Sequence, residues 1–331
     1  MNLWIFSLFL LFQFIFSQLN NSIHYRELEL HKYEIVDYNN TDQRATRLPP
    51  PQRTRSVLTH EVIGYLPYWQ YDYYPEINYD LLTQINYFSV ELTEIGGISN
   101  THNWSDLGMI SFAQDRGVKV KLSATLFGSA PLTILLTNPE YRQNAITNLL
   151  NLVVTADADG IDIDFELVPE SQRDNLVTFM TELADEFRSV IPGAIITMAS
   201  PAVDWWGSWD YLALSEICDG LFIMGYDYHW SGSATAGPVS PLGGFFYDVE
   251  YSVYDYLDVT NGNSEKIILG VPYYGYDWPV ISESIYSQTT DNANARIYST
   301  AINMADMYGQ SWDRSTNTNW ISYDNTGWQQ C

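Results

Sequence analysis

Short apolar runs follow one another along the chain from residue 61 onward, and polar segments separate them. Seven such runs are present: Val62–Tyr65, Ile85–Val90, Val118–Leu122, Ile161–Phe165, Ile195–Ala199, Leu221–Met224 and Ile267–Val271. Continuous apolar runs of this length are typical of strands that are buried on both faces of a parallel sheet. We therefore predict seven parallel strands.

A helix is predicted between the fourth and the fifth of these runs. Its apolar residues recur with a period of 3.6 and form one stripe; they are Leu176, Phe179, Met180, Leu183, Phe187, Val190 and Ile191. Pro192 and Gly193 then end the helix before the next strand. Repeated alternation of strands and helices predicts an α/β fold with a parallel sheet.

Polar and aromatic residues stand at the carboxyl ends of many predicted strands, which is typical of a (β/α)8 TIM barrel. A doubly wound sheet would collect its site at one switch point and usually carries a glycine-rich phosphate loop, which we do not find. Only seven strands are found, and the weak run Trp320–Tyr323 is the only further candidate. Because a barrel requires closure, we expect a TIM barrel that lacks its eighth strand in this sequence.

The first part of the chain differs in composition from the rest. Residues 3–16 are almost continuously apolar, a run too short for a membrane span and typical of a signal peptide. We predict a cleaved signal peptide at 1–17, a secreted protein, and an exposed polar leader or linker at 18–58 that wraps the domain. Residues 59–331 would form the barrel domain, incomplete at its carboxyl end.

Charge and composition narrow the classes of partner. The formal net charge of −25 argues against binding to nucleic acid or to anionic membrane surfaces. Two cysteines form neither a disulfide framework nor a metal cluster, and His229 has no second ligand at metal spacing. We therefore expect no metal, no cofactor and no membrane contact after signal cleavage, and we expect a monomer. Aromatic residues make up 15% of the chain, which favours exposed stacking surfaces for sugar rings.

The fourth apolar run carries acidic residues at every second position. In a strand this alternation places Asp162, Asp164 and Glu166 on one face, with neighbouring carboxylates about 6–7 Å apart. Buried like charges repel and need partners or a proton. An exposed strand with a solvated acidic face is the alternative, but the strongly apolar flanks favour a buried acidic face. Asp159, at the start of the strand, is interpreted as structural.

Asp159–Glu166 resembles the D-G-x-D-x-D-x-E signature of glycoside hydrolase family eighteen, the chitinase family. Weaker similarities follow in the expected order at Gly64-Tyr65, at Ser123, where the glycines of the family's S-x-G-G pattern are absent, and at Met224–Asp227, which matches M-x-Y-D. The tryptophan that the family places at the end of strand eight has no counterpart. The stretch Pro279–Trp320 leaves limited room for the α+β insertion of some members, so we expect a shallow cleft.

The resemblance implies catalytic roles for four residues. Glu166 would be the general acid and later the base, and Asp164 would orient the substrate's acetamido N–H and offset the charge of an oxazolinium ion. Asp162 would share a proton or a hydrogen bond with Asp164. Tyr226 would donate to the acetamido carbonyl, since the substrate's own N-acetyl group is the nucleophile in this family.

The resemblance also implies residues that bind substrate. Tyr65 and Ser123 would satisfy the inner aspartates, and Asp227 would contact the sugar. Met224 is more often a barrel-filling residue than a substrate contact, but in this family it can be both. Tyr65 could instead be an ordinary core tyrosine. Several tryptophans follow predicted strands and are candidates for sugar stacking, with loop packing as the alternative for about half of them: Trp69, Trp205, Trp206, Trp209, Trp230 and Trp278.

The function that follows from this resemblance is a secreted hydrolase of β-1,4-linked N-acetylglucosamine polymers, acting on chitin or chitooligosaccharides with retention of configuration. Two alternatives stay open. The chain could be an endo-β-N-acetylglucosaminidase acting on glycans or peptidoglycan, or a non-catalytic chitin-binding lectin on the same barrel. Because lectins of this kind usually lose the acid, the presence of Glu166 favours an enzyme.

Overall fold

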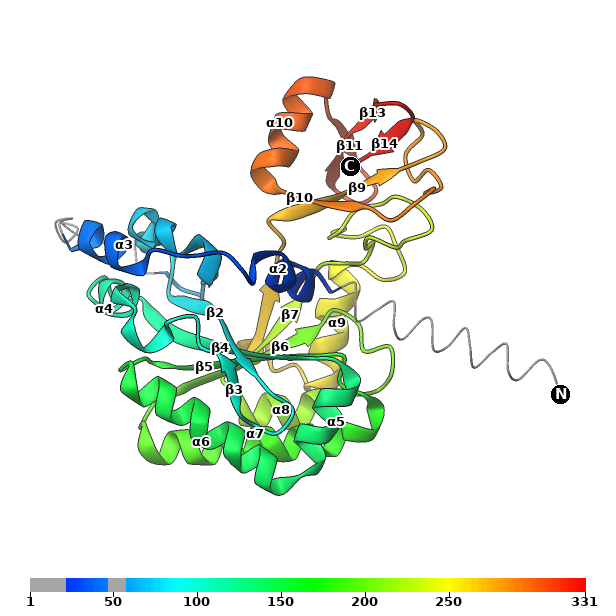
Figure 1. Cartoon of the computed structure of the whole chain (residues 1–331). Helices are drawn as coiled ribbons and strands as arrows, with labels where there is room; N and C mark the ends of the chain where they lie inside the picture. Colours follow the sequence, from blue (N-terminus) through cyan, green and yellow to red (C-terminus); the bar gives the residue numbers. More distant parts are fainter. Residues whose placement is uncertain (1–21, 47–57) are drawn as a thin grey trace. The chain divides into compact units, whose positions relative to one another are not determined.

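The computed structural model describes residues 22–46 and 58–331, which form two compact units (Figure 1). The larger unit holds His24–Ser200 and Trp205–Leu221, and the smaller unit holds Pro201–Asp204 and Phe222–Cys331. The boundary between the units falls within the strand β7. The predicted signal peptide at 1–17 lies outside the described residues. Across the described ranges, no helix is both long enough and apolar enough to cross a membrane.

All seven predicted strands are present and parallel in chain order. Their path is β1-β2-β4-β5-β6-β7-β8, with β1 and β8 at its two ends. This is a (β/α)8 TIM barrel that lacks one strand, as predicted. The bounds are β1 Ile63–Pro67, β2 Gln84–Leu92, β4 Lys119–Phe127, β5 Gly160–Glu166, β6 Ile195–Pro201, β7 Gly220–Met224 and β8 Ile267–Gly270; the short β3, Ile98–Asn100, pairs antiparallel with β2.

Helices connect the parallel strands, and in the larger unit α5 to α8 cover one face of the sheet (Figure 1). Their bounds are α4 Gly108–Gln114, α5 Ser129–Thr137, α6 Pro139–Thr155, α7 Arg173–Val190, α8 Tyr211–Ile217 and α9 Val249–Val259. Short 3-10 helices lie at η1 Tyr68–Glu76, η2 Tyr79–Leu81, η3 Trp104–Asp106, η4 Glu170–Gln172 and η5 Ser264–Lys266.

The helix α7 follows the predicted apolar stripe for most of its length. Its stripe residues from Leu176 to Phe187 are buried against the larger unit. The helix ends at Val190, whose side chain is exposed, because Pro192 cannot continue the helix. Gly193 follows with φ +85°, a conformation that glycine adopts without steric cost.

Residues 22–46 of the predicted leader or linker are folded and contact the barrel. They contain the helices α2, Ile23–His31, and α3, Tyr38–Ala45. Asp42 of α3 accepts hydrogen bonds from the hydroxyls of Tyr71 and Tyr74 in η1, at 2.5 and 3.0 Å. Its second oxygen accepts from the Gly108 N–H at the start of α4, at 3.1 Å. This half-buried carboxylate fixes α3 to η1 and α4, contacts that polar composition does not reveal.

The chain after β8 contains the additional α+β structure for which the sequence seemed to leave little room. A four-stranded antiparallel sheet has the order β10-β9-β14-β13, and β11 pairs with β12. The prediction of limited room is wrong because most of these strands are only three or four residues long. The run Trp320–Tyr323 belongs to this structure and not to the parallel sheet. The bounds are β9 Tyr274–Pro279, β10 Asn294–Ile297, α10 Tyr298–Tyr308, β11 Ser311–Asp313, β12 Thr318–Trp320, β13 Ser322–Asp324 and β14 Trp328–Gln330.

Candidate active site

The acidic strand β5 is buried along its whole length. Asp162 is 0% exposed, Asp164 1% and Glu166 8%, so the alternative of a solvated acidic face is excluded. The ordered pairing with β4 places Ser123 beside Asp162 and Thr125 beside Asp164 on the same face. The three carboxyl groups therefore form a row that ends at the carboxyl edge of the sheet, where TIM barrels place their active sites.

Asp162, the innermost carboxylate, is held by hydroxyl groups from three strands. Its Oδ2 accepts hydrogen bonds from Tyr65 at 2.8 Å and from Ser123 at 3.4 Å. Its Oδ1 accepts from Thr197 of β6 at 2.5 Å. These three hydroxyls are the side-chain partners of Asp162 in the described structure, and the proton or hydrogen bond shared with Asp164 that the resemblance implies stays a prediction.

A buried lysine lies behind Asp162. The Lys121 ammonium is fully buried and donates to Thr197 Oγ1 at 2.6 Å, and Thr197 in turn donates to Asp162. Burial lowers the pKa of Lys121 to about 8, although the negative charge of Asp162 acts in the opposite direction. Sequence reasoning missed Lys121 and Thr197. The signal in the sequence that could have identified Lys121 is its place inside the otherwise apolar run Val118–Leu122.

Asp164 lies in the middle of the row and lacks full hydrogen bonding. Burial, and then the negative charge of Glu166, raise the pKa of Asp164 well above its ordinary value, while His24 acts to lower it. Its Oδ1 is buried and has no hydrogen-bond partner in the described structure. Such an atom is costly unless a ligand or water satisfies it. The neutral carboxyl group can offer both a donor and an acceptor to a bound molecule.

Glu166, the outermost carboxyl, contacts a residue from the N-terminal segment. His24 Nδ1 of α2 lies 2.7 Å from Glu166 Oε1 and 3.5 Å from Asp164 Oδ2. The three side chains each offer a ligand atom, and these atoms lie within 4.8 Å of one another, a spacing that could also hold a metal ion. Sequence reasoning missed His24 because it treated the segment as a linker.

Aromatic rings flank the row at the carboxyl edge of the larger unit. Trp69 follows β1 and packs edge-on against Phe88 of β2, with ring centroids 6.0 Å apart. Phe127 ends β4, directly beside Glu166 in the strand pairing. Of these rings, sequence reasoning identified Trp69 but not Phe88 or Phe127. Together they form an apolar border beside the carboxyl groups.

Met224, Tyr226 and Asp227 lie in the smaller unit, where Met224 ends β7. Asp227 has φ +59° and accepts a hydrogen bond from the Tyr274 hydroxyl at 2.5 Å. The rings of Tyr226 and Tyr274 pack edge to face at 6.0 Å. Gly225 cannot carry a side chain, because an added Cβ would lie 2.7 Å from the Gly270 carbonyl oxygen. Tyr274 is a neighbour of the predicted pair that sequence reasoning did not single out.

The tryptophans divide between surface and core. Trp206 is 57% exposed and can offer a face to a ligand. Trp278 is only 1% exposed, packs with Tyr276 and Val280 in the core of the smaller unit, and donates to the Ser231 carbonyl. The prediction that Trp278 is an exposed stacking surface is therefore wrong. Trp278 lies within β9, where it pairs with Gln330 of β14, so its burial depends on the antiparallel sheet.

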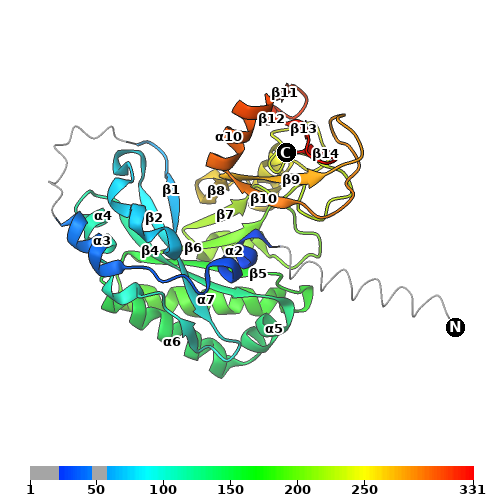
Figure 2. The same ribbon diagram turned by 45° about the horizontal axis from the view of Figure 1, so that its top comes forward.

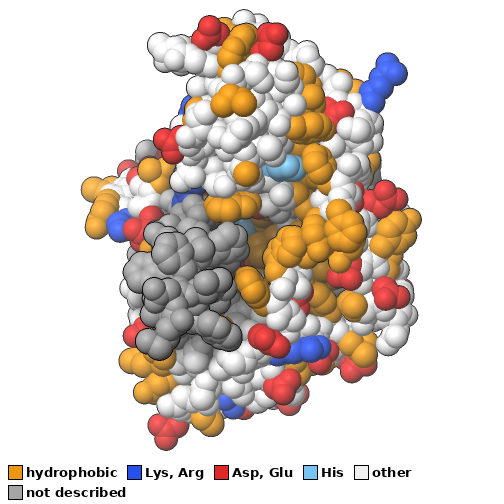
Figure 3. Space-filling model, turned by 90° about the vertical axis from the view of Figure 1, so that its right-hand side faces the viewer, with side chains coloured by type: hydrophobic (Ala, Val, Ile, Leu, Met, Phe, Trp, Pro, Cys, Tyr) orange, Lys and Arg blue, Asp and Glu red, His pale blue; other side chains and the backbone are white. Residues whose placement is uncertain are grey.

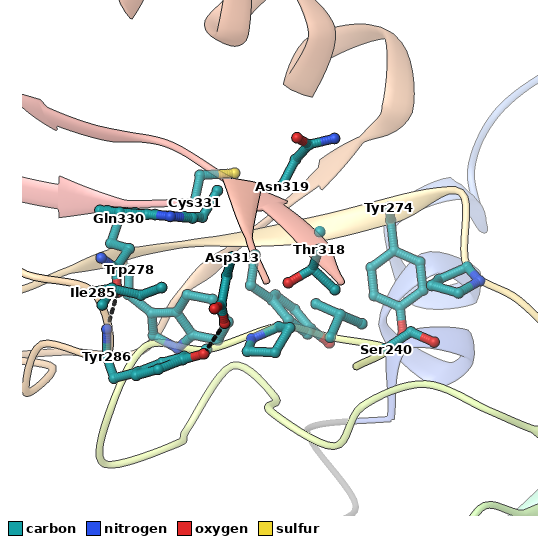
Figure 4. Close-up of a pocket in the computed structure, with 17 residues that line it drawn as sticks. Ser240, Tyr274, Trp278, Ile285, Tyr286, Asp313, Thr318, Asn319, Gln330 and Cys331 are labelled. Atoms are coloured by element: carbon teal, nitrogen blue, oxygen red, sulfur yellow. Dashed lines mark hydrogen bonds between the residues drawn. The ribbon is translucent and has the colours of Figure 1, made fainter. Parts of the chain in front are cut away.

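A cavity of about 220 Å³ lies within the smaller unit (Figure 4). Tyr274, Trp278 and Tyr286 line it, together with Asp313. The hydroxyl groups of Tyr286, Ser315 and Thr316 all donate to Asp313, which leaves this carboxylate structurally engaged. The cavity contains none of the acidic residues of β5, so we do not assign it to the reaction.

Comparison with known proteins agrees with this geometry. The family model described as "Glycosyl hydrolases family 18" matches residues 61–330. The "Putative sporulation-specific glycosylase YdhD" of Bacillus subtilis is 32% identical over 201 residues, which cover 58% of this chain and 45% of that protein. Human di-N-acetylchitobiase is 30% identical over 191 residues, 54% of this chain and 46% of the other. The chain thus spans about half the length of these curated relatives.

Solved structures share the fold. The crystal structure of YdhD has a TM-score of 0.64 at 28% identity, covering 75% of this chain and 82% of the other. The Group IV chitinase of Ostrinia furnacalis, solved with allosamidin, has a TM-score of 0.72 at 20% identity, covering 82% and 84% of the two chains. The second similarity concerns the fold alone.

Proposed function

The chain belongs to glycosyl hydrolases family 18, and from this premise we propose that it hydrolyses β-1,4-linked N-acetylglucosamine polymers, such as chitin or chitooligosaccharides. One observation carries the proposal. The row of carboxyl groups on β5 ends in Glu166 at the strand edge, and behind it Asp164 combines a raised pKa with a buried oxygen that lacks a partner. This pairing suits a site that binds an acetamido group beside a proton donor.

The proposed reaction has two steps. Glu166 gives its proton to the glycosidic oxygen while the substrate's acetamido oxygen attacks the anomeric carbon, so that the glycosidic bond breaks and a cyclic oxazolinium ion forms. Water then attacks the same carbon from the opposite face, and Glu166 takes up its proton. Two displacements restore the original configuration at that carbon.

The other residues would position the reacting groups. In the proposed site the buried oxygen of Asp164 accepts the acetamido N–H, which holds the nucleophile in line. The network of Tyr65, Thr197 and Lys121 keeps Asp162 fixed behind it. We also propose that Tyr226 donates to the acetamido carbonyl and that Asp227 and Met224 contact the sugar. These last three roles rest on the match to the family pattern.

Replacement of the acid tests the proposal. We expect Glu166→Gln to reduce the turnover of chitooligosaccharides by about 10²- to 10⁴-fold, because the amide cannot donate a proton to the leaving oxygen, while binding is retained. Turnover of a fluorogenic chitobioside and calorimetric binding of tri-N-acetylchitotriose provide the measurements.

Glu170→Gln is the matched control for this substitution, since Glu170 is exposed and lies just beyond the same strand. Turnover by Glu166→Gln above a tenth of the wild-type rate would remove Glu166 from the role of acid. Binding without turnover in the wild-type protein would instead favour the lectin alternative.

A second candidate substrate is peptidoglycan or a glycoprotein glycan, cut by endo-β-N-acetylglucosaminidase action. The 32% identity to a protein named as a sporulation-specific glycosylase favours it. Parallel assays on chitooligosaccharides, purified peptidoglycan and a high-mannose glycan would separate the candidates, since the preferred substrate should have the highest kcat/KM.

We further propose that the protein is exported through a signal peptide at 1–17 and acts as a monomer. Amino-terminal sequencing of the secreted protein and its mass in solution would test both points. Acidic side chains are spread over the face shown in Figure 3, with few basic ones, in keeping with the net charge of −25 and a neutral polymer substrate.

A further inference from the structure

The N-terminal segment at 22–46 lies against the candidate active site of the larger unit. Its helix α2 lies beside the end of β5 (Figure 2), and its helix α3 is fixed to η1 and α4. We propose that this segment, called the inhibitory segment below, occupies the substrate-binding surface and blocks hydrolysis until it is displaced. This inference rests on the proposed function and concerns how that function is regulated.

The first contact engages the residue that we propose as the proton donor. His24 Nδ1 lies 2.7 Å from Glu166 Oε1. If the imidazole donates, Glu166 Oε1 accepts its hydrogen bond, and the carboxyl group is held by the segment. If the imidazole accepts, the Glu166 proton points at the ring and away from any glycosidic oxygen. In both protonation states the general acid is engaged by the segment and not by a substrate.

The second set of contacts covers the aromatic border of the site. His31 stacks on Trp69 with ring centroids 4.5 Å apart and an angle of 7° between the planes. Tyr25 packs edge-on against Phe127 at 6.2 Å, and His24 packs against Phe88 at 5.7 Å. Flat aromatic faces are the surfaces on which pyranose rings stack. A sugar ring cannot occupy the face of Trp69 while His31 lies parallel to it at this distance.

The third feature is an anchor that is separate from the site. Asp42 of α3 accepts hydrogen bonds from Tyr71, Tyr74 and the Gly108 N–H, and Thr41 donates to Asp72. Helices of nine and eight residues are marginal by themselves in water. The position of α2 therefore depends on its contacts with the site and on the anchor in α3. Weakening either should release it.

Two substitutions in the full-length chain test the inference. Asp42→Ala weakens the anchor without touching the site, and His24→Ala removes the contact with Glu166 while leaving the anchor intact. If the blocked form leaves about 1–10% of molecules open, release should raise kcat/KM on chitooligosaccharides roughly ten- to hundred-fold. In a Glu166→Gln background, Asp42→Ala should tighten the binding of tri-N-acetylchitotriose by a similar factor.

Glu29→Ala is the control, because Glu29 is exposed on α2 and pairs with Lys32 of the same segment. Thermal unfolding shows whether each variant is folded. If Asp42→Ala does not fold, His24→Ala still tests the inference. A rise in activity of both variants, or of His24→Ala alone when Asp42→Ala is unfolded, supports the inference.

Other outcomes overturn it. If the wild-type protein hydrolyses the substrate and neither His24→Ala nor Asp42→Ala changes the rate, the inhibitory role of the segment is rejected. The proposed hydrolase activity would still stand. A lower kcat in His24→Ala would instead make His24 part of the catalytic apparatus. Absence of turnover on every N-acetylglucosamine substrate in all variants would reject the proposed function together with the inference.

Discussion

Asp164 is a carboxyl group whose surroundings favour the neutral form. It is buried between two acidic neighbours on β5, and burial contributes most to raising its pKa. The native protein therefore keeps a proton on Asp164 at pH values where the unfolded chain has released it. Stability consequently falls as pH rises from about the ordinary value of 3.8 through the higher native pKa.

Asp164→Asn should remove this part of the pH dependence, because asparagine is neutral at every pH. We expect similar melting temperatures for the variant and the wild-type protein near pH 4, and an increasing advantage of the variant as pH rises. Thermal unfolding between pH 4 and pH 8 provides the measurement. Asp185→Asn, on the exposed face of α7, is the control and should follow the wild-type slope. Equal slopes for Asp164→Asn and the wild-type protein would contradict the raised pKa.

The acidic strand is positioned by a close approach of its first residue to the next strand. An added Cβ at Gly160 would lie 1.9 Å from the carbonyl oxygen of Ile195, a distance that no real contact reaches. Gly160 and Ile195 are paired residues at the start of β5 and β6. The absence of a side chain at 160 therefore fixes the strand spacing that brings Thr197 to Asp162.

Gly160→Ala should separate β5 from β6 and displace the carboxyl row. We expect a loss of stability of about 1–3 kcal/mol, as for other overpacked cores, and a clear loss of turnover. Urea unfolding and chitobioside hydrolysis provide the measurements. Gly275→Ala is the control, since an added Cβ there meets nothing within 4 Å. If Gly160→Ala is as stable as the wild-type protein, β5 and β6 can move apart without loss of stability, and the prediction is wrong.

The charge of the whole molecule allows binding to be separated from chemistry. Fully deacetylated chitosan is a polycation, and a protein with a net charge of −25 attracts it at low salt. The proposed mechanism nevertheless requires the acetamido group as the nucleophile. Binding and hydrolysis should therefore depend on different features of the polymer.

We expect chitosan without acetyl groups to bind in a salt-dependent manner and not to be cut, while acetylated chitooligosaccharides are cut with the β-anomer as the first product. NMR of the products within the first minutes, and binding at two salt concentrations, provide the measurements. Efficient cleavage of the deacetylated polymer, or early release of the α-anomer, would exclude substrate assistance.

Local patterns were sufficient to predict the seven parallel strands, the helix α7 and the acidic row. The period of two along β5 is set by the alternation of side chains within one strand, so it needs no knowledge of neighbours. Runs of apolar residues likewise predict burial, because the free energy gained by removing an apolar side chain from water depends on that side chain and not on its particular neighbours. The resemblance to the family pattern, and not periodicity, pointed to the hydroxyls of Tyr65 and Ser123, which the structure brings to Asp162.

Contacts between segments that are distant in the chain were decided only by the tertiary structure. His24 and Glu166 are 142 positions apart, and nothing in the polar composition of the segment that contains His24 indicates where its helices lie. The burial of Trp278 and the short strands β11 to β14 likewise depend on partners that pack against them. A strand of three residues carries too few side chains for a detectable period, so only the pairing with its neighbours stabilises it.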